Sequence, residues 1–322
     1  MLVIVVILGL FSTLIHGFEP ELEKAQTHLL ERIREVHQLD KTQTANLRAL
    51  LWGHAPPILS QGNPKVVKHP VSTEECLQKH EALKLNFRDD EAEAICGARY
   101  MAPVYARGKS AGDAPVCVDR FEFPNIPCEY PVTWATAREA AMACEAVGER
   151  LCDVNEWESA CAGAYEEMDL GVSEYTHNSK REKIWATPQY FKGAKGVCGT
   201  GSAKSKGCDH AIQNGGDIWA SCGANTYPSG FYTECKSSFG VYDQHGNAAE
   251  HMNLPKSKKQ QGSQGGSGST EMKGSWFVFD QTYAHEDDCR WRAPFWHGTQ
   301  VMAGNSHQNY HLGFRCCKST QF

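Results

Sequence analysis

The spacing of apolar residues near the start of the chain predicts two helices. Between residues 19 and 39 apolar side chains recur three or four positions apart, as at Leu29 and Ile33. This period is typical of an amphipathic helix. A second helical pattern covers residues 42–52 and stops at a glycine followed by two prolines. We therefore predict that residues 18–110 form a helical N-terminal arm and a connector.

A mixed pattern follows in the rest of the chain. Residues 116–125 alternate apolar and polar side chains up to a Pro-Asn pair, which predicts a strand. An alanine-rich stretch, 135–147, predicts a helix that stops at a glycine. Asp153 stands three residues before Glu156, the spacing of a capping box at the start of a further helix. Short strands and short helices thus follow one another in the predicted main domain, residues 111–322.

The first residues carry the longest apolar run in the chain. Residues 2–15 are almost wholly apolar, but a membrane-spanning helix needs about 20 such residues. The run and the small residue Gly17 predict a signal peptide over residues 1–17. No lysine or arginine lies in the first 15 residues, so a retained short anchor is the alternative. We expect a secreted or extracytoplasmic protein with no stable membrane span once the signal is removed.

Fourteen cysteines agree with export, because disulfides persist in oxidising compartments such as the periplasm, the secretory lumen or the extracellular space. Their even number permits complete pairing, and no CxxC pair indicates a zinc ribbon. Cys76 and Cys96 could close a loop of about 20 residues, a cross-link worth roughly 3 kcal/mol. We predict a disulfide between them.

The net charge and the composition limit the kinds of partner that the chain is expected to bind. The net charge is -6, without the basic stripe that nucleic-acid-binding proteins carry. The expected partner is therefore a protein, a peptide or a small molecule of unknown identity. Residues 256–270 are rich in Gly, Ser, Gln and Lys, which predicts a flexible loop.

Residues 240–253, GVYDQHGNAAEHMN, combine oxygen donors with a tight turn. Asp243 and Glu250 are carboxylates seven positions apart, and Gly246 permits a folded-back path between them. Calcium takes six to eight oxygens from carboxylates and main-chain carbonyls. The two interpretations of this stretch are a calcium loop and a surface turn with solvated acids.

Five blocks, in order, carry a resemblance to a known family. They are Tyr130 to Trp134 (YPVTW), Gly148 to Glu158 (GERLCDVNEWE), Gly240 to Glu250 (GVYDQHGNAAE), Lys273 to Trp276 (KGSW) and Gly313 to Cys316 (GFRC). Together they resemble the formylglycine-generating enzyme family, also called the sulfatase-modifying factor family, over about residues 115–317. The resemblance implies an irregular, C-type-lectin-like α+β domain, low in regular structure and rich in disulfides.

The resemblance also implies particular bonds and ligands. It pairs Cys144 with Cys316 and Cys161 with Cys289. It implies structural calcium with Asp243 and Glu250 as side-chain ligands, and with carbonyl oxygens from Gly246 and Ala248.

The family's chemistry is only partly represented here. Members that make formylglycine hold copper(I) with two cysteines soon after the Gly-Ser block, and soft thiolates suit copper(I). Here no cysteine follows Gly274 and Ser275 until Cys289, so a copper cofactor is not expected. Ser275 keeps the position of a family active-site serine.

These departures leave three hypotheses about function. The leading one is a calcium-stabilised binding or structural module that does not form formylglycine. The second is a metal-dependent oxidase that uses C-terminal histidines, with His307 and His311 as candidates. The third is formylglycine synthesis through Cys316 or Cys317. The candidate catalytic residues are therefore Ser275, His307 and His311.

Overall fold

Two small sheets with helices around them make up the described part of the chain. The computed structural model describes residues 20–52, 60–187, 196–263, 267–279, 288–293 and 298–320. The helices are α1 (Pro20–Val36), α2 (Lys41–Trp52), α3 (Thr73–Ala82), α4 (Asp90–Cys96), α5 (Ala137–Ala146), α6 (Val154–Ala162), α7 (Glu174–Lys180), α9 (Cys208–Asn214) and α10 (Ile218–Ser221), with 3-10 turns η1 (Ala111–Asp113) and η2 (Lys258–Ser263). The strands are β1 (Met101–Val104), β2 (Val116–Asp119), β3 (Arg150–Leu151), β4 (Ala249–Leu254), β5 (Ser269–Lys273), β6 (Leu312–Phe314) and β7 (Cys316–Ser319). This mixture confirms the predicted α+β class.

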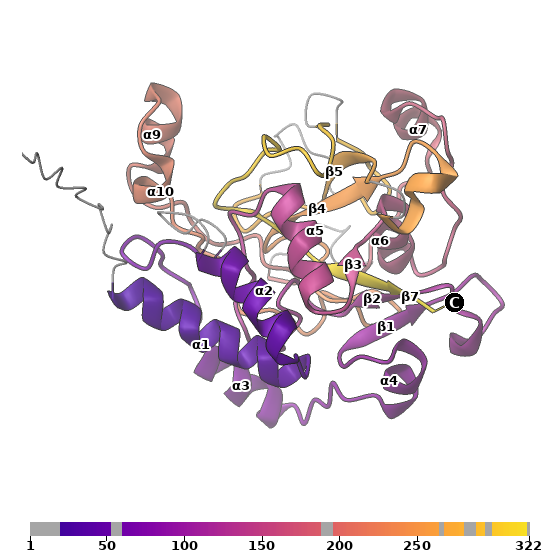
Figure 1. Ribbon diagram of the computed structural model, residues 1–322, viewed down its shortest axis with the longest axis horizontal. Coiled ribbons are helices and arrows are strands. Elements are labelled where there is room, and N and C mark those ends of the chain that lie inside the picture. Colours follow the sequence, from indigo (N-terminus) through magenta and orange to yellow (C-terminus); the bar gives the residue numbers. More distant parts are fainter. Residues whose placement is uncertain are drawn as a thin grey trace, which may run out of the picture.

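The N-terminal arm is a helical hairpin that packs on the rest of the molecule. Figure 1 shows α1 and α2 side by side, with α2 next to α5. Apolar residues at the predicted helical spacing, Leu29, Ile33, Leu47 and Leu51, are buried in one cluster with the alanines of α5. The arm therefore shares a core with the domain that follows it.

The two sheets differ in how their strands run. In the first, the order is β1-β2-β7-β3 and every neighbouring pair is antiparallel. In the second, the order is β5-β4-β6, with β4 antiparallel to β5 and parallel to β6. The last strands of the chain thus join both sheets: β6 lies in one and β7 in the other, with Arg315 between them.

One strand is shorter than its sequence pattern predicts. The alternation over residues 116–125 forms strand only to Asp119. Beyond it the chain turns: Phe121 donates its backbone N–H to Asn125 Oδ1, and Asn125 has a left-handed φ of 60°. The side chain of Asn125 therefore closes a turn where the apolar alternation alone favours a longer strand.

Seven disulfides join all fourteen cysteines. The pairs Cys144–Cys316 and Cys161–Cys289 are those that the resemblance implies. The predicted Cys76–Cys96 bond is wrong, because Cys76 bonds Cys128 and Cys96 bonds Cys117. The physical reason is tertiary: α4 packs beside β1, which pairs with β2, so Cys96 meets Cys117 of β2 rather than the nearer cysteine in sequence. The remaining pairs are Cys152–Cys317, Cys198–Cys235 and Cys208–Cys222.

Several other predictions concern the ends and loops of the chain. Within the predicted flexible loop, 256–270, the turn η2 and the first residues of β5 have regular structure. Here Asp153 Oδ2 accepts the N–H of Gly262, and Asn253 Oδ1 accepts that of Gly268.

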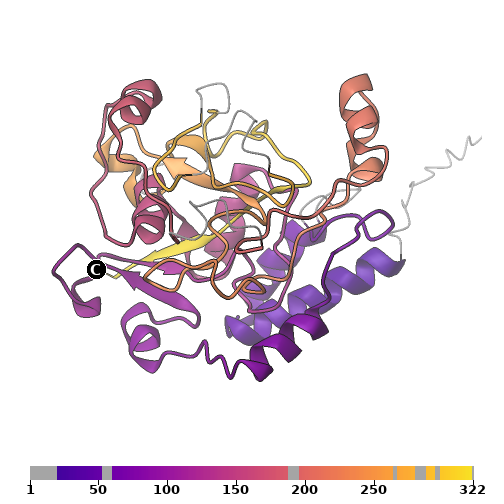
Figure 2. The same cartoon turned by 180° about the vertical axis from the view of Figure 1, so that it is seen from behind.

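Helices α9 and α10 stand away from the other elements in both views (Figure 1 and Figure 2). The predicted signal peptide lies outside the described residues, and no described helix is both long and apolar enough to cross a membrane.

Candidate functional site

The loop predicted to bind calcium folds around a buried arginine. Two nitrogens of the Arg315 guanidinium donate to the two carboxylate oxygens of Glu250, each at 2.6 Å. The same guanidinium donates to the carbonyl oxygens of Asp119 and Tyr242, both at 3.0 Å. Trp157 Nε1 donates to Glu250 Oε2 at 3.0 Å. Glu250 is therefore fully engaged by protein donors.

The other predicted calcium ligands lie in the same buried region. Asp243 Oδ2 accepts the backbone N–H of Gly230 at 2.6 Å. Gly246 has a φ of 84°, and a Cβ there would lie 2.9 Å from the backbone of Gly199, so only glycine fits without strain. Ala248 donates its N–H to Glu122 Oε1 at 2.8 Å. The structure thus brings the predicted residues together, in a hydrogen-bonded core.

Arg315 competes with a calcium ion for Glu250. Calcium needs several oxygens with open faces at one point. Here the Arg315 guanidinium covers both oxygens of Glu250 and already supplies the positive charge. Calcium binding by Asp243, Gly246, Ala248 and Glu250 stays a prediction that metal removal can test.

We expect calcium removal to leave the thermal stability unchanged. Because Arg315 neutralises Glu250, a chelator selective for calcium should not move the melting temperature of the purified chain, followed by near-ultraviolet circular dichroism. A fall in melting temperature that added calcium reverses would contradict this expectation. A Glu250→Gln variant would then show whether this loop is the site.

The predicted catalytic residues each have contacts within the protein. Ser275 is buried, and its Oγ accepts the backbone N–H of Gly246 at 2.7 Å. His311 packs on Trp276, with ring centroids 4.4 Å apart. Burial lowers the pKa of His307. Within the described ranges, none of the groups of three His, Cys, Asp or Glu ligand atoms that lie within 4.8 Å of one another contains His307 or His311.

The cysteines offer no thiolate in this state, because each is oxidised in a disulfide. His245 of the predicted loop lies beside one of these bonds, with Nε2 3.7 Å from Cys161 Sγ and 4.0 Å from Cys289 Sγ. Its Nε2 accepts the N–H of Ala186 at 2.9 Å, so the ring proton is on Nδ1. His245 therefore holds the segment that contains Ala186 next to the Cys161–Cys289 disulfide.

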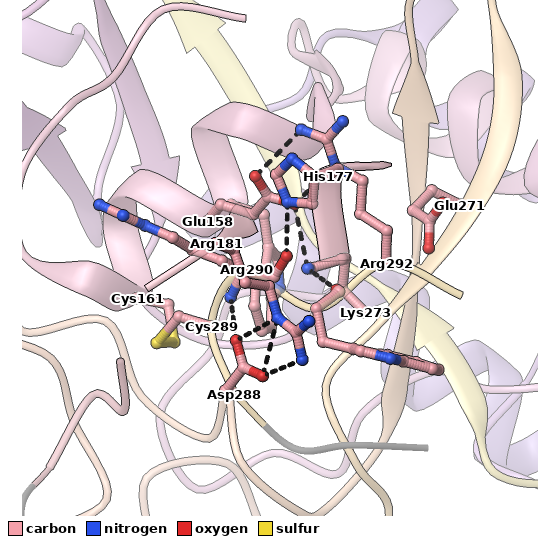
Figure 3. Close-up of polar contacts among 12 residues, drawn as sticks. Glu158, Cys161, His177, Arg181, Glu271, Lys273, Asp288, Cys289, Arg290 and Arg292 are labelled. Atoms are coloured by element: carbon pink, nitrogen blue, oxygen red, sulfur yellow. Dashed lines mark hydrogen bonds and ion pairs between the residues drawn. A yellow bond between two sulfur atoms is a disulfide. The ribbon is translucent and has the colours of Figure 1, made fainter. Parts of the chain in front are cut away.

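A cavity of about 380 Å³ lies on the other side of this disulfide, between α6, α7 and residues 290–292. Figure 3 shows the charged side chains gathered there, with Glu158 at the centre. The cavity is lined by side chains from residues 155–182 and from Arg290 and Arg292, and we call it the α6–α7 cavity. Its lining is Asn155, Glu158, Ser159, Ala162, Ala164, Glu166, Glu167, Asp169, Val172, Thr176, His177, Lys180, Arg181, Glu182, Arg290 and Arg292.

Glu158 organises the buried side of this cavity. It accepts from Lys273 Nζ at 3.1 Å and from Arg292 Nε and Nη2 at 3.0 and 3.2 Å. Burial alone would raise the pKa of Glu158, but Lys273 and Arg292 hold it below the ordinary value. Burial also lowers the pKa of His177, whose Nε2 donates to the Arg290 carbonyl at 2.7 Å. His177 is therefore neutral, with an acceptor lone pair on Nδ1.

The cations in the cavity wall are matched by acids. Arg181 donates to both oxygens of Asp288, at 3.2, 3.1 and 2.7 Å. Arg290 is paired with Glu166. Asp288 precedes the Cys161–Cys289 disulfide, which ties this wall to α6. The walls are thus fixed by ion pairs and by a covalent bond before any ligand enters.

Beneath the cavity lies a second buried acid whose charge depends on pH. Burial raises the pKa of Glu271 to about 8, although Lys273 opposes this. The ordinary value is 4.5, so between about pH 4.5 and about pH 8 the folded state holds a proton that the unfolded state has lost. The contribution of Glu271 to stability is therefore complete below about pH 4.5 and is lost as the pH rises to about 8.

We expect Glu271→Gln to reduce this loss of stability. The amide oxygen can still accept the N–H of Ala293, as the carboxyl does. Each pKa unit corresponds to about 1.4 kcal/mol, so the variant should lose a few kcal/mol less unfolding free energy between about pH 5 and about pH 8 than the parent. Urea denaturation at both pH values measures this, with Glu145→Gln on the exposed side of α5 as control. Equal losses in parent and variant would contradict the assignment.

Sequence reasoning missed this cavity. The pattern of α6 marks Glu156 as a capping residue but gives no sign that Glu158 is buried. A signal was present in the charges themselves: Lys273 and Arg292 lie close to apolar and aromatic residues in the sequence.

Comparisons with known proteins add only distant likenesses. No family model and no curated protein matches the chain. Among solved structures, CarF matches with a TM-score of 0.36 and 12% identity, over 67% of this chain and 92% of that one. Variable protein 1 of Treponema denticola matches with a TM-score of 0.31 and 13% identity, over 73% and 82%. At such TM-scores the likeness carries no argument about chemistry.

Proposed function

We propose that this chain is an extracytoplasmic binding module, a distant formylglycine-generating-enzyme-like protein with a C-type-lectin-like domain that does not make formylglycine. Seven intramolecular disulfides are typical of proteins outside the cytoplasm and support this location. The five ordered sequence blocks support the distant relationship. The binding role rests on the α6–α7 cavity.

One observation carries the choice of ligand. Asn155 Nδ2 donates to the Glu166 carbonyl at 3.0 Å, which leaves Oδ1 as a buried acceptor with no hydrogen-bond partner among the described residues. Asn155 lines the cavity, and a buried acceptor without a donor is costly. His177 lines the same cavity, and its Nδ1 is an acceptor because Nε2 donates to the Arg290 carbonyl. The cavity therefore favours a ligand with N–H donors.

The charged side chains around the α6–α7 cavity also favour a ligand with N–H donors. Arg181, Arg290 and Arg292 are each paired with a carboxylate of the site. This leaves Lys180 against the three exposed acids of the rim, Glu167, Asp169 and Glu182. An excess of carboxylates attracts a cation.

The apolar part of the lining indicates which class of cation the cavity can hold. Ala162, Ala164 and Val172 are half-buried and give the wall an apolar part. Lysine and arginine side chains combine a methylene stem with a charged donor head. We propose that the cavity takes a lysine or arginine side chain of a peptide or protein.

Binding of a cationic peptide tests this proposal. We expect a lysine-rich peptide to bind the full chain in isothermal titration calorimetry, and a glutamate-rich peptide of equal length not to bind. The combined change Glu167→Gln, Asp169→Asn and Glu182→Gln removes the rim charge and should weaken binding roughly tenfold, since exposed ion pairs contribute about 0.2–1 kcal/mol each.

The matched control removes three exposed acids elsewhere, Glu81→Gln, Glu91→Gln and Glu145→Gln, and should bind like the parent. Equal binding by the rim variant and the control would show that the cavity is not the site. No binding of the lysine-rich peptide would overturn the proposal.

A second experiment addresses formylglycine synthesis. A Cys-x-Pro-x-Arg peptide incubated with the protein, oxygen and copper(I) should keep its mass, because the cysteines are all in disulfides. Conversion of the thiol to the aldehyde removes the elements of hydrogen sulfide and adds one oxygen atom, so it would appear as a loss of mass. That loss, seen alongside an active formylglycine-forming enzyme as positive control, would contradict the proposed function.

A further inference from the structure

A second cavity lies between α1 and the segment that precedes α3. It has a volume of about 280 Å³ and shares no lining residue with the α6–α7 cavity. Its lining comes from α1, from residues 60–69 and from Tyr130, and we call it the α1 cavity. Pockets that hold drug-sized ligands have about 300–1,000 Å³, so the α1 cavity suits a smaller molecule.

The helix side of this cavity is apolar except for one amide. Leu22, Ala25, Gln26 and Leu29 line it, and their spacing of three and four positions places them on one face of α1. Leu22, Gln26 and Leu29 are buried, with Gln26 only 2% exposed. Gln26 is therefore a polar residue at a core position, where each polar atom needs a hydrogen-bond partner.

Gln26 has a partner for only one end of its amide. Its Nε2 donates to the carbonyl oxygen of Leu51 at 2.6 Å. Because a carbonyl only accepts, this bond also fixes the orientation of the amide. Oε1 is buried and has no hydrogen-bond partner among the described residues. A buried acceptor without a donor is costly, and Gln26 lines the α1 cavity, so a ligand there can supply the missing donor.

Two stacked rings contribute an aromatic part to the lining. The ring centroids of His69 and Tyr130 lie 3.4 Å apart, with 10° between the ring planes. Tyr130 Oη donates to the Val71 carbonyl at 2.7 Å, and His69 Nδ1 donates to the Thr226 carbonyl at 2.9 Å. Burial lowers the pKa of His69 to about 4, so its ring is neutral at neutral pH. Hydrogen bonds within the protein therefore hold both rings in place.

The charge of the lining limits the ligand further. None of the described residues that line the α1 cavity is an acid, a lysine or an arginine. A charged ligand would lose its hydration there without gaining an ion pair, which is unfavourable. The ligand is therefore neutral and mainly apolar.

We propose that the α1 cavity binds a small, neutral aromatic molecule with one N–H or O–H donor, such as an indole or a phenol. Its ring packs against Leu22, Leu29 and the aromatic part of the lining, and its donor satisfies Gln26 Oε1. This ligand differs from the cationic side chain proposed for the α6–α7 cavity, so each site can be tested without the other.

Indole and 1-methylindole test the proposal, because only indole has an N–H donor. We expect indole to bind the full chain in isothermal titration calorimetry, and to bind roughly threefold to tenfold more tightly than 1-methylindole, as the loss of one hydrogen bond implies. Gln26→Leu removes the acceptor but keeps an apolar wall. This variant should weaken indole binding by a similar factor and should bind both compounds alike.

Two further variants keep the result interpretable. Gln26→Leu also loses the bond to Leu51, so far-ultraviolet circular dichroism checks its fold. Ala25→Leu enlarges an exposed residue of the lining and should weaken the binding of both compounds equally. The matched control Gln78→Leu makes the glutamine-to-leucine change at an exposed position of α3 and should bind indole like the parent.

Three outcomes would overturn the proposal. The first is that indole does not bind the parent. The second is that the parent binds indole and 1-methylindole equally, or that Gln26→Leu keeps the preference for indole, because the donor would then not meet Gln26. The third is that Ala25→Leu binds indole like the parent, because the ligand would then lie elsewhere.

Discussion

The buried pair of Arg315 and Glu250 constrains the rest of the structure. Taking both charges out of water costs several kcal/mol per ion, and only complete hydrogen bonding offsets that cost. Arg315 meets this condition with four acceptors, which come from β2, from the loop before β4 and from β4 itself. Since Arg315 lies between β6 and β7, its contacts fix both sheets relative to each other. Any shift of register would leave a buried charge without a partner.

The sequence predicted the local elements well, because their signals are local. The spacing of Leu29 and Ile33 in α1 and the capping pair of Asp153 and Glu156 in α6 depend only on neighbouring residues. The long-range bond between Cys144 and Cys316 came from the resemblance, not from the pattern of residues. Where neither source applied, nearness in sequence misled, as it did for Cys76.

The polar sites were harder to predict for a physical reason. A glutamate in a helix has the same local pattern whether it faces water or a buried cation, so nothing distinguished Glu158 from a solvated acid. Likewise, the partner of Glu250 is an arginine 65 positions away, and the calcium site was implied by the family resemblance rather than by the loop pattern. Around Glu158 the cations are supplied by the protein itself.

The adjacent cysteines of β7 have a consequence for the integrity of the chain. Neighbouring residues of a strand point to opposite faces, so Cys316 reaches Cys144 of α5 while Cys317 reaches Cys152, just after β3. Both bonds enclose most of the domain, with sequence separations of 172 and 165 residues. A protease that cuts any single peptide bond between Cys152 and Cys316 therefore leaves two fragments that remain covalently joined. In an environment rich in proteases, such a chain can be nicked in its loops and still remain one molecule.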